Sequence, residues 1–398
     1  MSLVMFSKPM GRVLIGVISL VVILALLFHE DAHRSFDDVL DGRVPDVKSW
    51  SPKLPKLPSW SQPQEDHTSF TSSPFGFMPD GPELDAMCTR YRWETYPHRY
   101  QRRKIYDLVL LNDELDSLAL RMGQMHDVDY FVVVESDLTF SDHQKPLHVL
   151  DNWAMFNENH HKMIRVTLNM TGQTFGDAWA RETFSRNAMF DQVFPNLQNE
   201  QAPNNGDVII VGDVDELVRP EILIAMRNCQ ITERVKLWTR FYYYSFQWLH
   251  PEGHAEWGHP DATFFQGLND TILPQSLRTG GATTDIYSAG WHCSYCFGDL
   301  QAIVNKVKSF SHQEMNTPDF TDPSKILQRV RNGVDLFNRG NLYRIDKNLD
   351  VPDFVTRNID RFGWILNRDG EDGGFRDTWD LISREQSNGP GSVGATTG

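Results

Sequence analysis

Three apolar runs, each ending abruptly in polar residues, constrain the fold of this chain more than any other feature. The runs span 105–111, 130–134 and 208–211, and the polar residues that follow them include Asn112, Glu135, Ser136 and Asp213. Between the runs, apolar residues recur at helical spacing, as in Leu115, Leu118 and Met122. Continuous apolar strands that alternate with helices are typical of a parallel sheet covered on both faces. The sequence therefore predicts a mostly parallel α/β fold, with ligands gathering beyond the carboxyl ends of the strands.

Asp213 and Asp215 stand one residue apart at the end of the third run, which we expect to be a buried strand. Such a pair can hold a hard divalent cation, directly or through water, and Mg²⁺ or Mn²⁺ can bind substrate phosphates at the same time. The cation would make a diphosphate a better leaving group. It would also explain how a chain of net charge −15 binds an anionic substrate. An acidic turn before a helix that begins at Pro220 is the plainer alternative.

Two other functional classes fit the sequence poorly. Haloacid-dehalogenase-type phosphotransferases carry Asp-x-Asp-x-Thr after a strand, with the first Asp as nucleophile. Here Glu216 takes the place of the Thr, and no Lys followed by an Asp pair appears in the expected order. A nucleic-acid partner needs a basic face, whereas this chain has 38 Lys and Arg against 53 Asp and Glu.

Five motifs in order resemble those of glycosyltransferase family 17, and the similarity spans roughly residues 104–384. They read VLLNDELDSL (109–118), YFVVVES (130–136), GDVDELVRPE (212–221), GWHCSY (290–295) and KVKSFSHQE (306–314). The resemblance implies a GT-A-like nucleotide-sugar fold, a UDP-GlcNAc donor, Mn²⁺ dependence and inversion at the anomeric carbon. It further implies transfer of N-acetylglucosamine to a mannose-containing glycan of a glycoprotein. A non-catalytic glycan-binding or scaffold protein on the same fold is the alternative, and Asp213 and Asp215 speak against it.

The expected site residues fall into four roles. We expect Asp213 and Asp215 to hold the metal, with His312 completing its shell, as a His does in several GT-A enzymes; a hydrogen-bonded core His is the other reading. Glu216 either takes part in catalysis or orients Asp215. The general base is left open among Asp285, His292 and Glu314. Donor-binding candidates are Asn112, Glu135, Ser136, Arg181, Arg186 and Lys306. Trp291 is the candidate for stacking on an acceptor sugar, although buried packing is as plausible.

Some of these candidates have a local structural explanation. Arg181 and Arg186 lie on a helix expected to start near Asp177, and Lys306 on one after Gly298. Glu182 and Arg186 are four residues apart, so a surface ion pair would also account for them.

The N-terminus indicates a membrane anchor. Residues 13–28 form an apolar run that, at ~1.5 Å per residue, spans roughly 24 Å, less than the ~30 Å core of a typical bilayer. Lys8 and Arg12 precede it, which predicts a cytosolic tail (1–12) and a lumenal body. A cleaved signal peptide is the alternative, but no good small-x-small site follows the run. A short span suits a thin early-secretory membrane.

Composition divides the rest of the chain. Residues 29–85 are rich in Pro and Ser and are expected to form an extended stem, 86–385 the lumenal domain, and 386–398 a disordered tail. This layout is shared by many Golgi-resident transferases, so we expect a single-pass type II Golgi membrane protein. Asn169 and Asn269 begin Asn-x-Thr glycosylation acceptors.

The four cysteines, Cys88, Cys229, Cys293 and Cys296, are expected to form structural disulfides in an oxidising lumen, with the pairing left open. The Cys293-x-x-Cys296 spacing also invites a redox or zinc reading, but the sequence offers little support for either.

Overall fold

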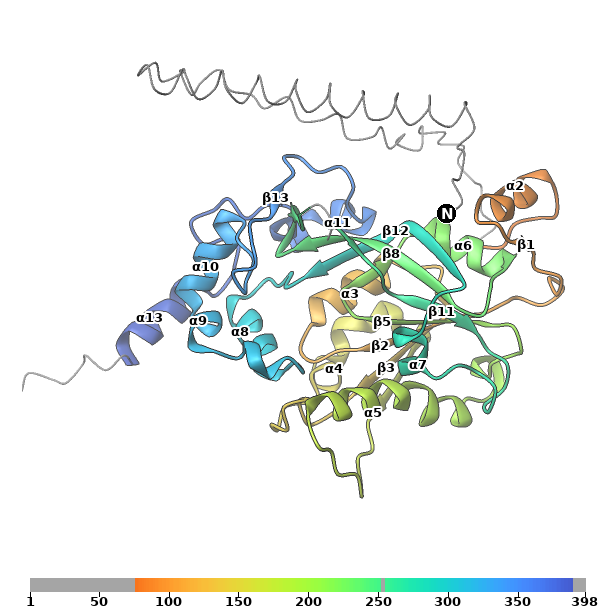
Figure 1. Ribbon diagram of the computed structural model, residues 1–398, viewed down its shortest axis with the longest axis horizontal. Helices are drawn as coiled ribbons and strands as arrows, with labels where there is room; N and C mark the ends of the chain where they lie inside the picture. The colour runs from red at the N-terminus through yellow and green to blue at the C-terminus, as the bar shows by residue number, and fades with distance from the viewer. Residues whose placement is uncertain (1–75, 252–254, 389–398) are drawn as a thin grey trace, which may run out of the picture. The chain divides into compact units, whose positions relative to one another are not determined.

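The three predicted strands lie side by side in the computed structural model, which describes residues 76–251 and 255–388 (Figure 1). All of these residues belong to one unit of the chain, Thr71–Gly398. The strands are β1 (Glu94–Thr95), β2 (Ile105–Leu110), β3 (Tyr130–Glu135), β4 (Met163–Thr167), β5 (Val208–Asp213), β6 (Glu216–Val218), β7 (Cys229–Gln230), β8 (Val235–Tyr243), β9 (Ser245–Leu249), β10 (Glu256–Trp257), β11 (Asp261–Phe264), β12 (Thr284–Ser294) and β13 (Tyr343–Arg344).

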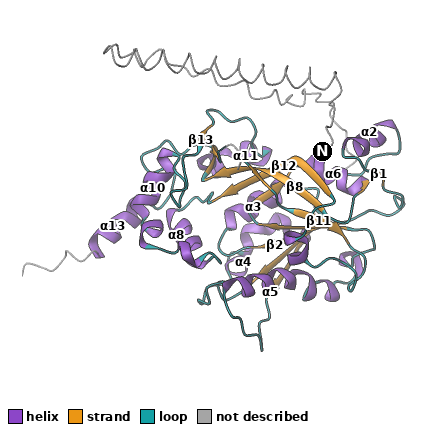
Figure 2. Ribbon diagram, viewed as in Figure 1, coloured by secondary structure: helices purple, strands orange, loops and turns teal. Residues whose placement is uncertain are grey.

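Figure 2 shows helices on several sides of the strands. The α-helices are α2 (Pro82–Arg90), α3 (Leu115–Gln124), α4 (His148–Asp151), α5 (Ala178–Asp191), α6 (Pro220–Asn228), α7 (Pro274–Thr279), α8 (Leu300–Ser309), α9 (Pro318–Thr321), α10 (Pro323–Asn332), α11 (Asp353–Arg357), α12 (Ile359–Phe362) and α13 (Thr378–Asn388). The 3₁₀ segments are η2 (Trp153–Lys162), η3 (Phe194–Asn196), η4 (Asn199–Gln201), η5 (Gln313–Met315) and η6 (Gly363–Ile365).

One large mixed sheet organises the domain, with the order β13-β9-β8-β11-β5-β2-β3-β4. The half formed by β5, β2, β3 and β4 is parallel throughout. In the other half β8 and β12 run parallel. The pairs β5–β11, β11–β8, β8–β9 and β9–β13 are antiparallel. The prediction of an α/β fold with a central sheet is confirmed, whereas the expectation of a mostly parallel sheet holds for one half only.

Strand β2 shows why this sheet is covered on both faces. All six of its residues are buried. Ile105 and Val109 pack in one apolar cluster with α3 and α6, whereas Tyr106, Leu108 and Leu110 pack in a second cluster with α5. Because side chains of a strand alternate between faces, the two clusters lie on opposite sides of the sheet. Its register places Leu110 beside both Asp213 and Val134, so the three strands end together.

The predicted helix signals are confirmed. The spacing of Leu115, Leu118 and Met122 corresponds to α3, and α6 begins at Pro220. The α5 helix begins after Asp177, whose carboxylate accepts a hydrogen bond from Ala180 N at 2.8 Å. A third apolar cluster joins the C-terminal helices α8 and α10 to Tyr243, Tyr244 and Trp248 on the far half of the sheet. These helices gather at one end of the domain in Figure 1.

The packed domain begins earlier than the predicted boundary at residue 86. Met78 is buried in the core, and its N–H donates to Asn228 Oδ1 at 3.0 Å. The Asn228 side chain in turn donates to the Gly76 carbonyl at 2.7 Å. Residues 76–85, assigned from composition to the stem, therefore belong to the body. At the other end, α13 continues to Asn388, inside the predicted tail.

Two disulfides connect the four cysteines. Cys88 in α2 pairs with Cys229 in β7. Cys293 in β12 pairs with Cys296, which lies just after that strand. The expectation of structural disulfides is confirmed, with a pairing that the sequence left open. Within residues 76–251 and 255–388 no helix is long and apolar enough to cross a bilayer. The predicted anchor at 13–28 and its cytosolic tail lie outside these described residues.

Candidate functional site

A pocket of about 570 Å³ lies where the sequence predicted a crevice, beyond the carboxyl ends of β2, β3 and β5. One wall comes from the parallel half of the sheet and from α5. The other comes from β8, β12 and α8. Among the predicted site residues, those that line the pocket are Asn112, Ser136, Arg186, Asp213, Asp215, His292, Lys306 and His312. Asn112 and His312, which are 200 residues apart in the sequence, thus contribute to one site.

Asp213 is held between two arginines. Its Oδ1 accepts from Arg186 Nη2 at 3.0 Å and its Oδ2 accepts from Arg278 Nη2 at 2.7 Å. Burial alone would raise the pKa of Asp213, but Arg278 and then Arg186 outweigh it, so that the pKa lies below its ordinary value. With its side chain 39% exposed, this ionised carboxylate still reaches the pocket.

Asp215 is held by a lysine instead. Lys306 Nζ lies 2.9 Å from Asp215 Oδ2 and 3.4 Å from Glu114 Oε1. His292 Nε2 lies 3.7 Å from the other oxygen, Asp215 Oδ1. Burial alone would lower the pKa of Lys306, but the two carboxylates raise it above its ordinary value, so the lysine stays charged.

Glu216 lies behind the two aspartates rather than in the pocket. It is fully buried and accepts from Asp213 N at 2.8 Å, from Trp257 Nε1 at 2.7 Å and from both terminal nitrogens of Arg278. The first of these bonds lies within the turn between β5 and β6, and the others join Glu216 to β10 and α7. Of the two roles considered from the sequence, orientation therefore fits the structure, although the groups it holds are the Asp213 backbone and Arg278 rather than the side chain of Asp215.

A buried ion pair also supports the turn between β5 and β6. Arg121 on α3 is fully buried and pairs with Asp107 of β2, with Nε 2.6 Å from Oδ2. The same guanidinium donates to the Asp213 carbonyl at 2.9 Å and to the Glu216 carbonyl. Asp107 interrupts an otherwise apolar strand, and this pairing explains its presence there.

Among the three base candidates, His292 is the one that lines the pocket. Its imidazole is stacked on Phe241 with centroids 4.6 Å apart and lies 5.0 Å from Trp257. Burial lowers its pKa below the ordinary value, against the opposing effect of Asp215. Its Nδ1 is buried and has no hydrogen-bond partner in the part of the chain that the structure describes.

The other two base candidates lie elsewhere. The Asp285 carboxylate accepts from Trp238 Nε1 at 2.7 Å and does not line the pocket. Glu314 is exposed and bonded to His312 Nδ1 at 2.7 Å. Neither side chain lines the pocket, so the structure gives these two candidates no support as the base.

Two donor-binding candidates, Glu135 and Arg181, do not line the pocket. Glu135 is buried beside the pocket, where its carboxylate accepts from the backbone N–H groups of Val149 and Leu150 and pairs with Arg165. It therefore caps α4, while its neighbour Ser136 lines the pocket. Arg181 donates instead to the Phe140 carbonyl and to Asp142, each at 2.6 Å.

Trp291, the acceptor candidate, is part of the core. It is 4% exposed, its Nε1 lies 3.0 Å from Asp350 Oδ1, and Arg219 covers its ring at 4.1 Å. Adjacent residues of a strand face opposite sides, so that His292 reaches the pocket and Trp291 cannot. The aromatic residue exposed at the pocket is Trp179 on α5, which sequence reasoning did not single out.

The third expected metal ligand does not join the two aspartates. His312 lines the pocket, but it is half exposed, bonded to Glu314, and edge-on to Trp179 at 4.6 Å. Among the described residues no three His, Cys, Asp or Glu side chains form a group that could hold a metal ion. Asp213 and Asp215 nevertheless offer hard oxygen donors, which fit Mg²⁺ or Mn²⁺ when a substrate supplies further ligands.

Arg278 is a charged residue of the pocket that no sequence pattern indicated. It lies in the last turn of the short helix α7, 65 residues after Asp213, and no motif surrounds it. Its side chain is 8% exposed and lines the pocket, and its guanidinium joins Asp213 to Glu216. Only the packing of α7 against β5 and α5 reveals it.

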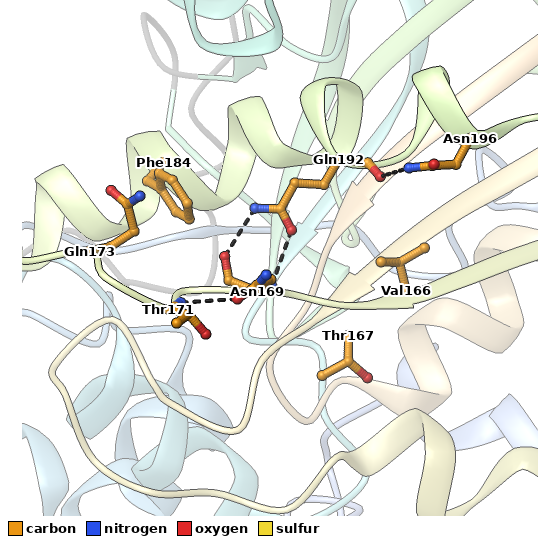
Figure 3. A pocket seen from close by; sticks show the side chains of 8 residues that line it. All are labelled: Val166, Thr167, Asn169, Thr171, Gln173, Phe184, Gln192 and Asn196. Carbon is orange, nitrogen blue, oxygen red and sulfur yellow. Dashed lines mark hydrogen bonds between the residues drawn. The ribbon is translucent and has the colours of Figure 1, made fainter.

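A second, shallower hollow of about 530 Å³ surrounds Asn169 (Figure 3). The Gln192 side chain bonds both backbone groups of Asn169, whose own Oδ1 accepts from Thr171 N at 3.0 Å. The Asn169 side chain is exposed, and so is that of Asn269. Both are accessible for the predicted glycosylation, which stays a prediction.

Comparison with known proteins adds a family assignment. The model of "Glycosyltransferase family 17" matches residues 56–367. The human protein "Beta-1,4-mannosyl-glycoprotein 4-beta-N-acetylglucosaminyltransferase" is 25% identical over 299 residues, covering 67% of this chain and 55% of its own length. The rat protein of the same name is 24% identical, covering 66% and 54%. The chain thus spans about half the length of the curated relatives it matches.

Solved structures show only a distant likeness. An inositol-1-phosphate CTP transferase from T. maritima superposes on 48% of this chain and 87% of its own, with 12% identity and a TM-score of 0.26. A mannosyltransferase from Pyrobaculum calidifontis, solved with GDP-Man and Mn²⁺, covers 77% and 81%, with 10% identity and a TM-score of 0.29. Superpositions this weak carry no argument about the site.

Proposed function

We propose, because this chain belongs to glycosyltransferase family 17, that it transfers N-acetylglucosamine from UDP-GlcNAc to a mannose-containing glycan of a glycoprotein. The observation that carries the proposal is the arrangement of charge in the pocket. Asp213 and Asp215 stand at the end of β5 among three cations, Arg186, Arg278 and Lys306. The names of the human and rat relatives support the choice of sugar and of acceptor.

The charged groups suit a nucleoside diphosphate. Mn²⁺ or Mg²⁺, held by Asp213 and Asp215, would supply charge neutralisation for the departing diphosphate. Arg186, Arg278 and Lys306 present guanidinium and ammonium groups that bind phosphate oxygens well. Asn112 and Ser136 offer polar groups at the ends of β2 and β3, where we place the nucleoside.

We place the acceptor glycan at the wall of the pocket that β8 and β12 form. Inversion requires the acceptor hydroxyl to approach the sugar carbon from the face opposite the leaving diphosphate, while a base takes the hydroxyl proton. His292 is the base candidate that we retain because it lines this wall, fixed between Phe241 and Trp257. Positioning by these rigid strands would lower the barrier further.

The cellular setting is proposed from the sequence. An uncleaved anchor at 13–28, preceded by Lys8 and Arg12, would place the domain in the Golgi lumen as a single-pass type II membrane protein. The two disulfides support an oxidising compartment for the body.

A donor screen with the full chain tests the activity. UDP-sugars and GDP-sugars are offered with and without Mn²⁺, together with a mannose-terminated N-glycan, and release of the nucleotide is followed. We expect acceptor-dependent release of UDP from UDP-GlcNAc that requires the metal. A glycan-binding protein would release none, and a phosphotransferase would form a phosphoaspartate at Asp213. Either outcome in folded protein would refute the proposal.

A further inference from the structure

Lys306 occupies an unusual position for a donor-binding residue, because it is already engaged with an acidic group that we assign to the metal. Its Nζ lies 2.9 Å from Asp215 Oδ2, and its side chain is only 19% exposed. The rings of Tyr295 and Phe297 flank the ammonium at 5.5 and 5.6 Å. A charge so placed has little freedom to turn to water, so its position is a property of the packed site.

The helix that carries Lys306 is firmly anchored. Leu300, Ile303 and Val307 of α8 are buried in the C-terminal cluster. The first turn of α8 donates two backbone hydrogen bonds to the Asp377 carboxylate, at 2.6 Å from Leu300 and 3.0 Å from Gln301. With its backbone fixed in this way, Lys306 could exchange Asp215 for another partner only by rotation of its side chain.

The negative charges of the two aspartates are already balanced by nearby cations. Asp213 is shared by Arg186 and Arg278, and Asp215 is paired with Lys306. Arg186 and Lys306 also reach the neighbouring acids, Glu182 at 2.8 Å and Glu114 at 3.4 Å. A divalent cation that enters alone meets repulsion from these three cations, and it finds no third protein ligand among the described residues.

A diphosphate changes this balance. It supplies oxygen ligands for the metal and, in the same pocket, negative charge for the cations that the metal displaces. The chain's own residues thus favour arrival of metal and nucleotide together over arrival of the metal first.

We propose that Lys306 stands in for the divalent cation on Asp215 while the pocket holds no nucleotide, and turns to the donor's diphosphate when metal and nucleotide enter together. This inference rests on the proposed function. Because such coupling is reciprocal, UDP should raise the affinity for Mn²⁺ by the same factor by which Mn²⁺ raises the affinity for UDP. We expect that factor to be about tenfold or more, within the range of ordinary allosteric couplings.

Calorimetric titration of the full chain tests this, with Mn²⁺ alone, UDP alone and each in the presence of the other. In Lys306→Met, which frees Asp215, Mn²⁺ alone should bind severalfold more tightly than to the wild type, while UDP binds more weakly in the presence of Mn²⁺. Lys306→Arg keeps the competing charge, so Mn²⁺ without UDP should still bind weakly. Lys145→Met is the matched control, because Lys145 lines the pocket but donates to the Asn112 carbonyl at 3.3 Å.

The opposite signs expected for the two ligands separate this role from a merely structural one. If folded Lys306→Met binds Mn²⁺ alone no better than the wild type does, Lys306 does not compete with the metal, and the inference is overturned while the proposed function stands. Equal Mn²⁺ affinity of the wild type with and without UDP has the same consequence. If the wild type binds no UDP at any Mn²⁺ concentration, the proposed function itself fails. Circular dichroism and urea unfolding establish that each variant is folded.

Discussion

Asp213 and Asp215 take different cations as partners, yet both should be indispensable. Replacing either by Asn keeps the shape of the side chain and removes the charge that would hold the metal. We expect Asp213→Asn and Asp215→Asn each to lower the rate of UDP release by about 10²-fold or more. Glu314→Gln, at an exposed residue outside the pocket lining, should remain close to the wild type. Near-normal release by either folded Asn variant would remove that aspartate from the mechanism.

Asp113, beside the pocket, should make stability depend on pH. Burial, and then the charge of Glu114, raise its pKa from 3.8 to about 6. The native state therefore holds a proton that the unfolded state loses, and the free energy of unfolding should fall as the pH rises from about 4 to about 6. Asp113→Asn should lack this fall. Urea unfolding of both proteins at about pH 4 and about pH 7 measures it, and parallel changes in the two would contradict the assignment.

At the same scale, the sequence located part of the site and missed the rest for a definite reason. Asp213, Asn112 and Ser136 follow apolar runs, so strand ends alone bring them together. The place of Arg278 depends on how α7 packs, and no local pattern encodes that. For Trp291, buried packing was one of two alternatives, and the packing of β12 favours it. Glu135 follows a run as well, yet its carboxylate caps α4 instead.

Among the elements, β2, β3, β5, α3 and α6 were predictable because each carries its own periodic or apolar pattern. The mixed half of the sheet, which contains β8, β9, β11, β12 and β13, was not. In β12, an irregular register between Ile286 and Gly290 shifts the pairing with β8, and its partners lie far away in sequence. Such pairing is decided by contacts between distant segments, which periodicity does not report.

The disulfide between α2 and β7 should be the stronger of the two covalent links. Cys88 and Cys229 close a loop of 141 residues, whereas Cys293 and Cys296 are three apart. In the chain-entropy description, removing the long-range bridge costs about 5 kcal/mol and the short one about 2 kcal/mol. Unfolding in urea of Cys88→Ala/Cys229→Ala and Cys293→Ala/Cys296→Ala measures both losses. An equal or reversed order would show that loop closure does not govern them.

For the molecule as a whole, the N-terminal boundary of the domain is testable. Met78 is buried, and Asn228 binds the backbone of Gly76 and Met78. A chain that begins at residue 86 should therefore be less stable than one that begins at 76, by about 2 kcal/mol or more from the apolar burial of Met78 alone. Equal urea midpoints for the two chains would contradict the packing of residues 76–85 on the body.

The central claim is that this pocket transfers a sugar from a nucleoside diphosphate to a glycan. The most direct measurement incubates the full chain with UDP-GlcNAc, Mn²⁺ and a mannose-terminated N-glycan, and follows the glycan by mass spectrometry. The account predicts a mass gain of one N-acetylhexosamine, matched by one UDP released and abolished in Asp215→Asn. An unchanged glycan with folded wild-type protein and saturating donor would contradict it.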